Sequence, residues 1–142
     1  MTSRRRARRQ AIDILYQADV TGADAQLSLA EWHAAGREID PFAEELVEGV
    51  TANRPEIDDV LSAHSEHWTL DRMASLDRTI LRLAVFELIH RPDVPAAAAI
   101  SEAVEIAKEL STEDSGRFVN GILGKVAEEL EPEPGREQPD PA

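Results

Sequence analysis

The chain has 142 residues, a formal net charge of −13 and no cysteine. This length fits a single domain with a substantial core, and the lack of cysteine excludes disulfide bonds, thiolate metal sites and cysteine nucleophiles. No apolar run approaches the roughly 20 residues that a membrane span requires, and the start of the chain does not resemble a signal peptide. We therefore expect a cytoplasmic protein with no membrane segment.

Positive charge is concentrated at the start of the chain. Residues 1–12 carry five arginines and no acid, whereas the remaining residues carry ten basic and 28 acidic side chains, a net charge of −18. Guanidinium groups stay charged and bind phosphate oxygens in pairs, so the cluster favours a nucleic-acid contact confined to one end of the protein. A solubilising basic tail is the simpler alternative. The arginines are Arg4, Arg5, Arg6, Arg8 and Arg9.

Apolar residues recur at helical spacing along most of the chain, and alternating strand patterns are missing, which predicts an all-α fold. The first predicted helix contains the arginines. Its buried face extends up among them, so we expect them to be ordered along the first two turns and not to form a loose tail. Arg5, Arg9, Ile12 and Tyr16 lie on a neighbouring face, and Gly22 helps to end the helix. The buried face consists of Ala7, Ala11, Ile14, Leu15 and Ala18.

Three shorter helices are expected next. A weak pattern between Leu27 and Ile39 predicts the first of them. Asp40 then resembles a helix cap, followed by Pro41 at the first helical position, and Pro55 separates that helix from the one after it. Three aromatic residues fall on the apolar stripes and are predicted core residues, namely Trp32, Phe42 and Trp68.

The second half of the chain begins with a strongly apolar run over residues 71–90. It predicts a central, mostly buried helix, which Pro92 and Pro95 end. A further amphipathic helix follows, with its apolar stripe running from Ile100 to Leu110. These two helices are expected to contribute much of the core.

The last predicted helix starts near Phe118, after a polar loop at residues 111–116. Gly121 and Gly124 lie inside it at a cost of about 1 kcal/mol each, so we expect close helix packing to offset them. From residue 131 onward the chain is rich in proline and charge and has no apolar anchor. We therefore expect one domain over residues 1–130 and a disordered acidic tail over residues 131–142.

No set of residues has the pattern of a catalytic or metal centre. His64 and His67 are three positions apart, but no third ligand accompanies them, and a surface or capping role is far more common than a zinc site. No glycine-rich phosphate loop or nucleophile elbow is present. We expect a non-enzymatic protein without a cofactor or metal. Tyr16 and Phe118 are candidates for stacking on unpaired bases, with plain packing as an equal alternative.

Three segments resemble the NusB transcription antitermination family. They are the opening RRRARRQAIDILYQ, the central WTLDRMASLDRTILRLAVFEL and the late TEDSGRFVNGIL, and the resemblance spans residues 4–127. It implies about seven helices in two small bundles packed across each other, and no catalytic activity. It also implies binding of boxA RNA from ribosomal RNA operon transcripts together with NusE, a ribosomal protein of the small subunit. The complex would join an elongating RNA polymerase.

The resemblance also implies which residues bind. It assigns RNA to the basic N-terminus and the start of the FVNG helix, and the protein partner to the central helix. Ser101 stands where the family commonly has asparagine, and Gly124 where it often has an acid. The implied RNA-binding residues are Arg4, Arg5, Arg6, Arg8, Arg9, Asp114, Arg117 and Phe118, and the implied partner-binding residues are Tyr16, Asp77, Arg78 and Ile80.

Two other classes stay open beside an RNA-binding adaptor. One is a homodimeric helical scaffold that binds protein without direct RNA contact. The other is a ribosomal RNA cytosine methyltransferase, some of which carry a NusB-like domain, although the cysteine and glycine-rich loop of that chemistry are missing here. For the adaptor, we expect glutamate at Arg5, Arg8 and Arg9 to abolish RNA binding with little change in melting temperature.

Overall fold

The computed structural model describes residues 3–65 and 69–130. Over these ranges the chain forms seven α-helices, one short 3-10 helix and no strand, which confirms the all-α prediction. Trp68, His67 and the tail at residues 131–142 lie outside the described residues. The elements are α1 (Ser3–Thr21), α2 (Ala25–Ala34), α3 (Pro41–Ala52), α4 (Arg54–Ala63), η1 (Leu70–Arg72), α5 (Ser75–His90), α6 (Ala96–Leu110) and α7 (Glu113–Leu130).

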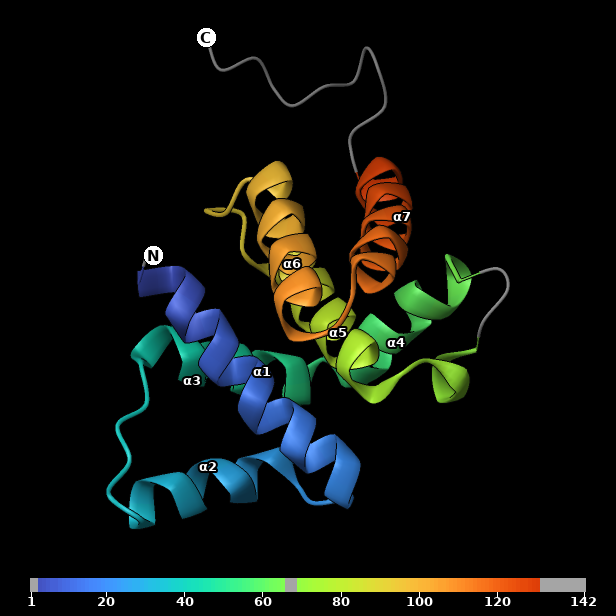
Figure 1. Ribbon diagram of the computed structural model, residues 1–142. Helices are drawn as coiled ribbons and strands as arrows, with labels where there is room; N and C mark the ends of the chain where they lie inside the picture. Colours follow the sequence, from blue (N-terminus) through green and yellow to red (C-terminus); the bar gives the residue numbers. More distant parts are fainter. Residues whose placement is uncertain (1–2, 66–68, 131–142) are drawn as a thin grey trace, which may run out of the picture.

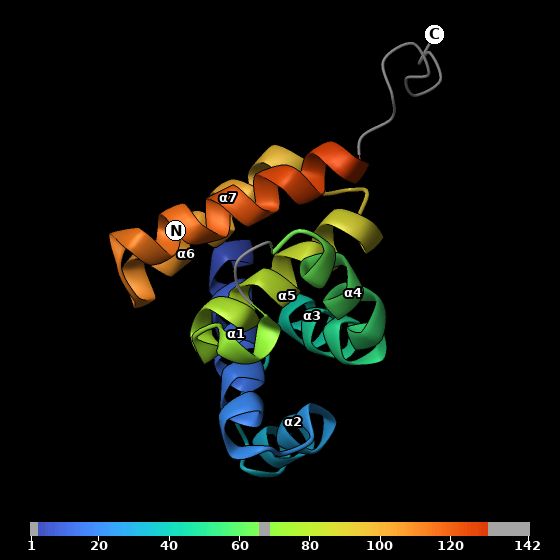
Figure 2. The same ribbon diagram turned by 90° about the vertical axis from the view of Figure 1, so that its right-hand side faces the viewer.

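The helices form two groups that share α5. The pair α6 and α7 lies side by side across α5, as both ribbon views show (Figures 1 and 2). On the other side α1 packs against α2, α3 and α5, and α4 packs against α5. The central position of α5 explains why its sequence is apolar on more than one face, and the prediction of a mostly buried helix is confirmed.

Several helix starts follow the capping signals of the sequence. Asp40 Oδ1 accepts a hydrogen bond from Phe42 N at 2.8 Å, and Pro41 is the first residue of α3, as predicted. Helix α7 starts earlier than predicted, because Thr112 Oγ1 accepts from Ser115 N at 3.0 Å and caps its first turn. Part of the expected polar loop at residues 111–116 is therefore helical.

The central helix starts later than predicted, at Ser75. The chain before it forms η1 and then two extended residues, Met73 and Ala74. Arg78 reaches back over this bend, and its Nη1 donates to Leu70 O at 2.7 Å. A side-chain donor thus satisfies a carbonyl that a longer helix would have used, which stabilises the break.

The core contains the predicted aromatic residues that the structure describes. Trp32 and Phe42 are buried, and so is the complete apolar face of α1. Ile12 lies on the same face of α1 as Arg9 and Tyr16, as expected, but it is buried. The buried stripe of α1 is wider than the sequence indicated, because the helix lies between α3 and α5.

The glycines in α7 do not serve close packing. A Cβ atom at Gly121 or Gly124 would meet nothing within 4 Å, so that prediction is wrong. The close approach lies at Gly49 in α3, where a Cβ would overlap the ring of Phe86. Gly22 ends α1 as predicted, with a left-handed φ of 76°.

Candidate nucleic-acid interface

The first half of α1 lies alongside α6, and arginines of α1 pair with acids of α6. Arg5 donates two hydrogen bonds to the carboxylate of Glu102, at 2.8 and 2.7 Å. One turn further on, Arg9 Nη1 is 3.1 Å from Glu109 Oε1. The hydrogen bonds from Arg5 lower the pKa of the Glu102 carboxyl. The arginines are therefore held in an ordered row, as predicted.

Arg8 differs from its neighbours because it is buried. Its Nε and Nη2 each donate to the carboxylate of Glu87 in α5 at 2.8 Å, and its Nη1 is 3.7 Å from Glu102. The side chains of Arg8 and Glu87 are 6% and 1% exposed. Direct RNA contact by Arg8 was expected, but its guanidinium is enclosed by the protein's own acids. We correct that expectation: the geometry makes Arg8 a link between α1 and α5.

Arg4 begins the row, and a residue that sequence analysis missed stands beside it. Arg4 lies over the ring of Phe42 at 4.4 Å, and Arg91 lies over the same ring at 5.0 Å. Both arginines also pair with Asp93. Arg91 extends the basic edge, and only the folding of the α5–α6 connection onto α3 brings it there.

Arg6 is exposed and forms no ion pair or hydrogen bond within the described residues. Taken together, the five arginines of the row lie beside four carboxylates. The net positive charge of this surface is therefore far smaller than the sequence indicates. The N-terminus of α1 adds the positive end of its helix dipole. The four acids are Glu87, Asp93, Glu102 and Glu109.

The second part of the expected RNA surface is the first two turns of α7. Asp114 and Arg117 are strongly exposed and form an ion pair with each other. Phe118 is partly buried against the core, which leaves one part of its ring accessible. Glu109, the partner of Arg9, lies four residues before the start of α7. The end of the arginine row therefore approaches the turn that carries the FVNG segment.

The implied partner residues do not form one exposed patch. Ile80 is 1% exposed and belongs to the core, so it offers no surface to a partner, and we correct that expectation. Asp77 is also buried. Its Oδ2 accepts a hydrogen bond from Ser115 Oγ at 3.4 Å, while its Oδ1 has no partner within the described residues. Burial raises the pKa of the Asp77 carboxyl.

The guanidinium of Arg78 is also engaged within the protein, because its Nη2 donates a hydrogen bond to Asp19 Oδ2 at 2.6 Å. Tyr16 is the most accessible of the four implied partner residues and is 37% exposed. Beside it lies a hollow of about 660 Å³, which has Arg9 on one side and Leu76 on the other. The hollow connects the arginine row with the start of α5, next to Asp77.

The described residues contain no helix that is long and apolar enough to span a membrane. They also contain no group of three or more His, Asp or Glu side chains placed to hold a metal ion. His64 has another role at the end of α4, where its Nδ1 is 2.9 Å from Val60 O and its Nε2 is 2.9 Å from Glu129. Of the two roles expected for this histidine pair, surface or capping, His64 therefore has the capping one.

The fold and the arginine row of α1 define a small all-helical protein. The ordered row is suited to binding a polyanion. Residues 5–128 match the family model described as the NusB family. The chain belongs to the NusB family.

Relatives and solved structures agree. The transcription antitermination protein NusB of Saccharopolyspora erythraea is 51% identical over 131 residues, which cover 89% of this chain and 88% of the relative. The NusB protein of Rubrobacter xylanophilus is 49% identical over 121 residues, which cover 85% and 87%. The structure is similar to T. maritima NusB, with a TM-score of 0.79, 38% identity and coverage of 90% and 92%. It is also similar to a chain in a crystal structure of the antitermination factors NusB and NusE with double-stranded RNA, with a TM-score of 0.77, 27% identity and coverage of 91% and 100%.

Proposed function

We propose that this protein is a non-enzymatic transcription antitermination factor of the cytoplasm. It binds boxA RNA of ribosomal RNA operon transcripts together with NusE, and the complex joins an elongating RNA polymerase. The observation that carries the proposal is the ordered arginine row on α1, which ends near the first turn of α7. Family membership and the similarity to a NusB–NusE–RNA complex support it.

In this proposal some arginines of the row bind phosphate and the others hold the row in position. Arg6 is unpaired within the described residues, and the side chains of Arg4 and Arg9 are 47% and 37% exposed, each in one ion pair. These three bind backbone phosphates, because an exposed ion pair is worth less than about 1 kcal/mol and a phosphate can replace the carboxylate. Arg5 and Arg8 hold the row in position through their two-hydrogen-bond pairs.

Sequence discrimination comes from the first two turns of α7. The ring of Phe118 stacks on an unpaired base, while Asp114 accepts hydrogen bonds from base amino groups and Arg117 binds phosphate. These contacts need single-stranded RNA, whose bases are free to unstack. Residues 1–130 act as one domain in this proposal, and the acidic tail takes no part in it.

NusE binds beside the RNA, over Tyr16 and the adjoining hollow. The exposed apolar side chains there supply affinity, since an exposed charge would contribute little. Asp77 and Arg78 act from beneath this surface by fixing the start of α5. The exposed apolar residues around this face are Tyr16, Val20 and Leu110.

A gel-shift titration with boxA RNA, with and without NusE, tests the proposal. We expect a complex with boxA RNA that NusE strengthens, and weaker binding to an RNA of equal length with a scrambled sequence. The same exposed apolar face also suits a second copy of the chain, so sedimentation over a concentration series belongs with the titration. A dimer without any RNA complex would replace the adaptor with a protein-only scaffold.

A further inference from the structure

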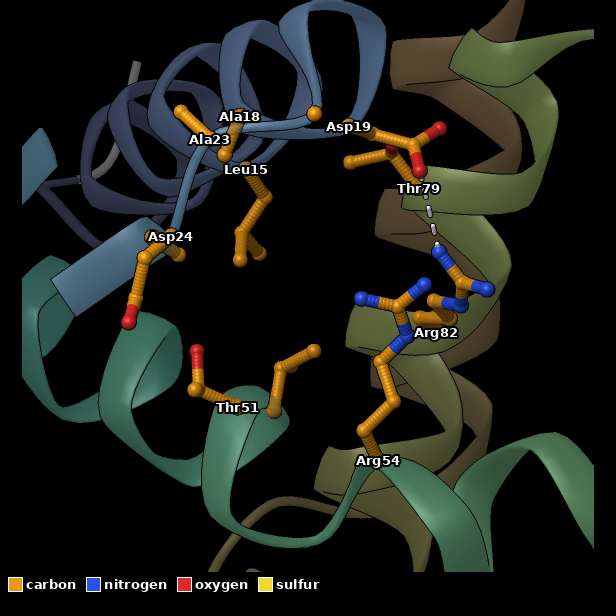
Figure 3. A pocket seen from close by; sticks show the side chains of 12 residues that line it. Leu15, Ala18, Asp19, Ala23, Asp24, Thr51, Arg54, Thr79 and Arg82 are labelled. Carbon is orange, nitrogen blue, oxygen red and sulfur yellow. Dashed lines mark ion pairs between the residues drawn. The ribbon is translucent and has the colours of Figure 1, made fainter. Parts of the chain in front are cut away.

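A cavity of about 410 Å³ lies on a different face of α1 from the hollow beside Tyr16, and the two share no lining residue. The end of α1, the start of α2, the end of α3 and the middle of α5 enclose it (Figure 3). None of its lining residues belongs to the arginine row or to α7. The cavity is therefore separate from the proposed RNA contacts, and Asp19 connects it to Arg78 beneath the proposed NusE surface.

Arg82 projects from α5 toward this cavity and is 8% exposed. Its Nε and Nη2 donate to the carboxylate of Asp58, at 2.8 and 3.2 Å. Its Nη1 is 3.6 Å from Asp19 Oδ1 and makes no hydrogen bond within the described residues. This N–H edge is not fully enclosed, because Asp77 Oδ1 is the only enclosed side-chain atom without a hydrogen-bond partner within the described residues. The edge is therefore accessible to solvent or to a ligand in the cavity.

A second guanidinium lies next to the first. Arg54, the first residue of α4, extends into the cavity beside Arg82 (Figure 3). Its Nε is 3.5 Å from Asp58 Oδ2, but the described residues give it no hydrogen bond. Thr79 also lines the cavity and is 2% exposed. Its hydroxyl has no hydrogen-bond partner within the described residues. Donor groups of three side chains therefore line one space.

The charge of the arginine wall favours one negative charge on a ligand. On this wall Arg54, Arg78 and Arg82 face the carboxylates of Asp19 and Asp58, which is a local surplus of one positive charge. Asp24 on the opposite wall balances that surplus over the cavity as a whole. A planar carboxylate matches the edge of a guanidinium, and its single negative charge suits a ligand group held against the arginine wall and away from Asp24.

The rest of the cavity fixes the ligand's other properties. Asp24 stands on the opposite wall, where a phosphate dianion would be repelled (Figure 3). Leu15, Ala18 and Val50 provide apolar surface between the two walls. A volume of about 410 Å³ suits a small organic group.

We propose that this cavity is a binding site for a carboxylate on a short apolar stem. The carboxylate accepts hydrogen bonds from Arg54, Arg82 Nη1 and the Thr79 hydroxyl, and the stem packs on the apolar surface. Such a group occurs in free small acids and in the glutamate side chain of a partner protein. The chemistry of recognition is the same for both sources.

Nuclear magnetic resonance titration of the full chain at constant ionic strength tests whether the cavity binds a carboxylate. The probes are butyrate, its neutral analogue butyramide, and glutamate blocked at both backbone ends. We expect butyrate to shift the amide signals of Ala25, Thr51 and Thr79 to saturation, and butyramide to leave them unchanged. Tighter binding of blocked glutamate than of butyrate assigns a partner's side chain, and the reverse order assigns a free acid.

Arg54→Gln weakens butyrate binding about tenfold or more, because it removes charge-assisted hydrogen bonds. Arg72→Gln, at an exposed arginine of η1 that does not line the cavity, is the matched control and leaves binding unchanged. Shifts that do not saturate, equal shifts with butyramide, or equal affinity in the Arg54 variant overturn the proposal. None of these results affects the RNA titration, which depends on other residues.

Discussion

Arg8 of α1 and Glu87 of α5 form a buried ion pair with two hydrogen bonds of 2.8 Å, although 79 residues separate them in the chain. Arg8→Gln leaves the Glu87 carboxylate buried without its partner, and we expect it to lower the free energy of unfolding by about 3–5 kcal/mol. Arg6→Gln, on the exposed side of the same turn, is the control and changes stability by less than about 0.5 kcal/mol. Urea denaturation of both variants measures the free energy of unfolding. Equal values for the Arg8 and Arg6 variants would show that Arg8 has no structural role.

This pair also revises the expectation for charge reversal in the row. Glutamate at Arg8 would place two carboxylates together in a buried position, so the triple replacement at Arg5, Arg8 and Arg9 should unfold the protein. Arg6→Gln instead tests RNA binding in a folded chain. We expect it to reduce the slope of log affinity against log salt by about 0.7, because one phosphate contact to a single strand is lost. An unchanged slope in filter-binding assays would show that Arg6 does not touch the RNA.

If Arg9 binds RNA as we propose, Glu109 competes with the RNA for it, since the two side chains pair at an exposed position. Glu109→Gln frees the guanidinium and removes a nearby negative charge, so we expect RNA affinity to rise about two- to fivefold at low salt. Glu128→Gln, at an exposed position near the other end of α7, is the matched control and has little effect. A gel shift at two salt concentrations checks both, and the gain should shrink at the higher one.

Asp77 makes stability depend on pH in a defined direction. Burial raises the pKa of its carboxyl above the ordinary value of 3.8, so the folded state binds the proton more tightly than the unfolded state. The destabilisation is absent below pH 3.8 and complete above the raised pKa. We expect Asp77→Asn to be more stable than the natural chain at pH 7 by about 0.5–1.5 kcal/mol. Thermal unfolding between pH 3.5 and 7 should show this difference disappear as the pH falls, and a difference independent of pH would contradict it.

Two glycine-to-alanine replacements should have opposite effects. Gly49→Ala forces the Phe86 ring to move, and we expect a loss of about 1–3 kcal/mol of stability. Gly121→Ala meets nothing within 4 Å and removes a flexible residue from α7, so we expect a gain of about 0.5–1 kcal/mol. Chemical denaturation of the two variants tests the packing at both places. A loss at Gly121 would mean that α7 has a neighbour close to that position.

Much of the fold was predictable because the relevant signals are local. Helical spacing identified the buried face of α1, and Asp40 with Pro41 marked the start of α3. The predicted starts of α5 and α7 were wrong because side-chain contacts determine where these helices begin. Arg78 donates a hydrogen bond to a carbonyl before α5, and Thr112 caps the first turn of α7. Neither contact leaves a periodic pattern in the sequence.

The sequence by itself determined the helical class, the order of the elements, the place of the arginine row and the family. Each depends on residue type and on spacing within a few turns. Only the tertiary structure decided which arginines reach solvent, because the carboxylates that pair with Arg5, Arg8 and Arg9 lie between 79 and 100 residues away in the chain. It also decided that Ile80 is buried and that Arg54 and Arg82 meet at one cavity. Burial and charge pairing are properties of packed helices, and helix packing brings together residues that no local pattern connects.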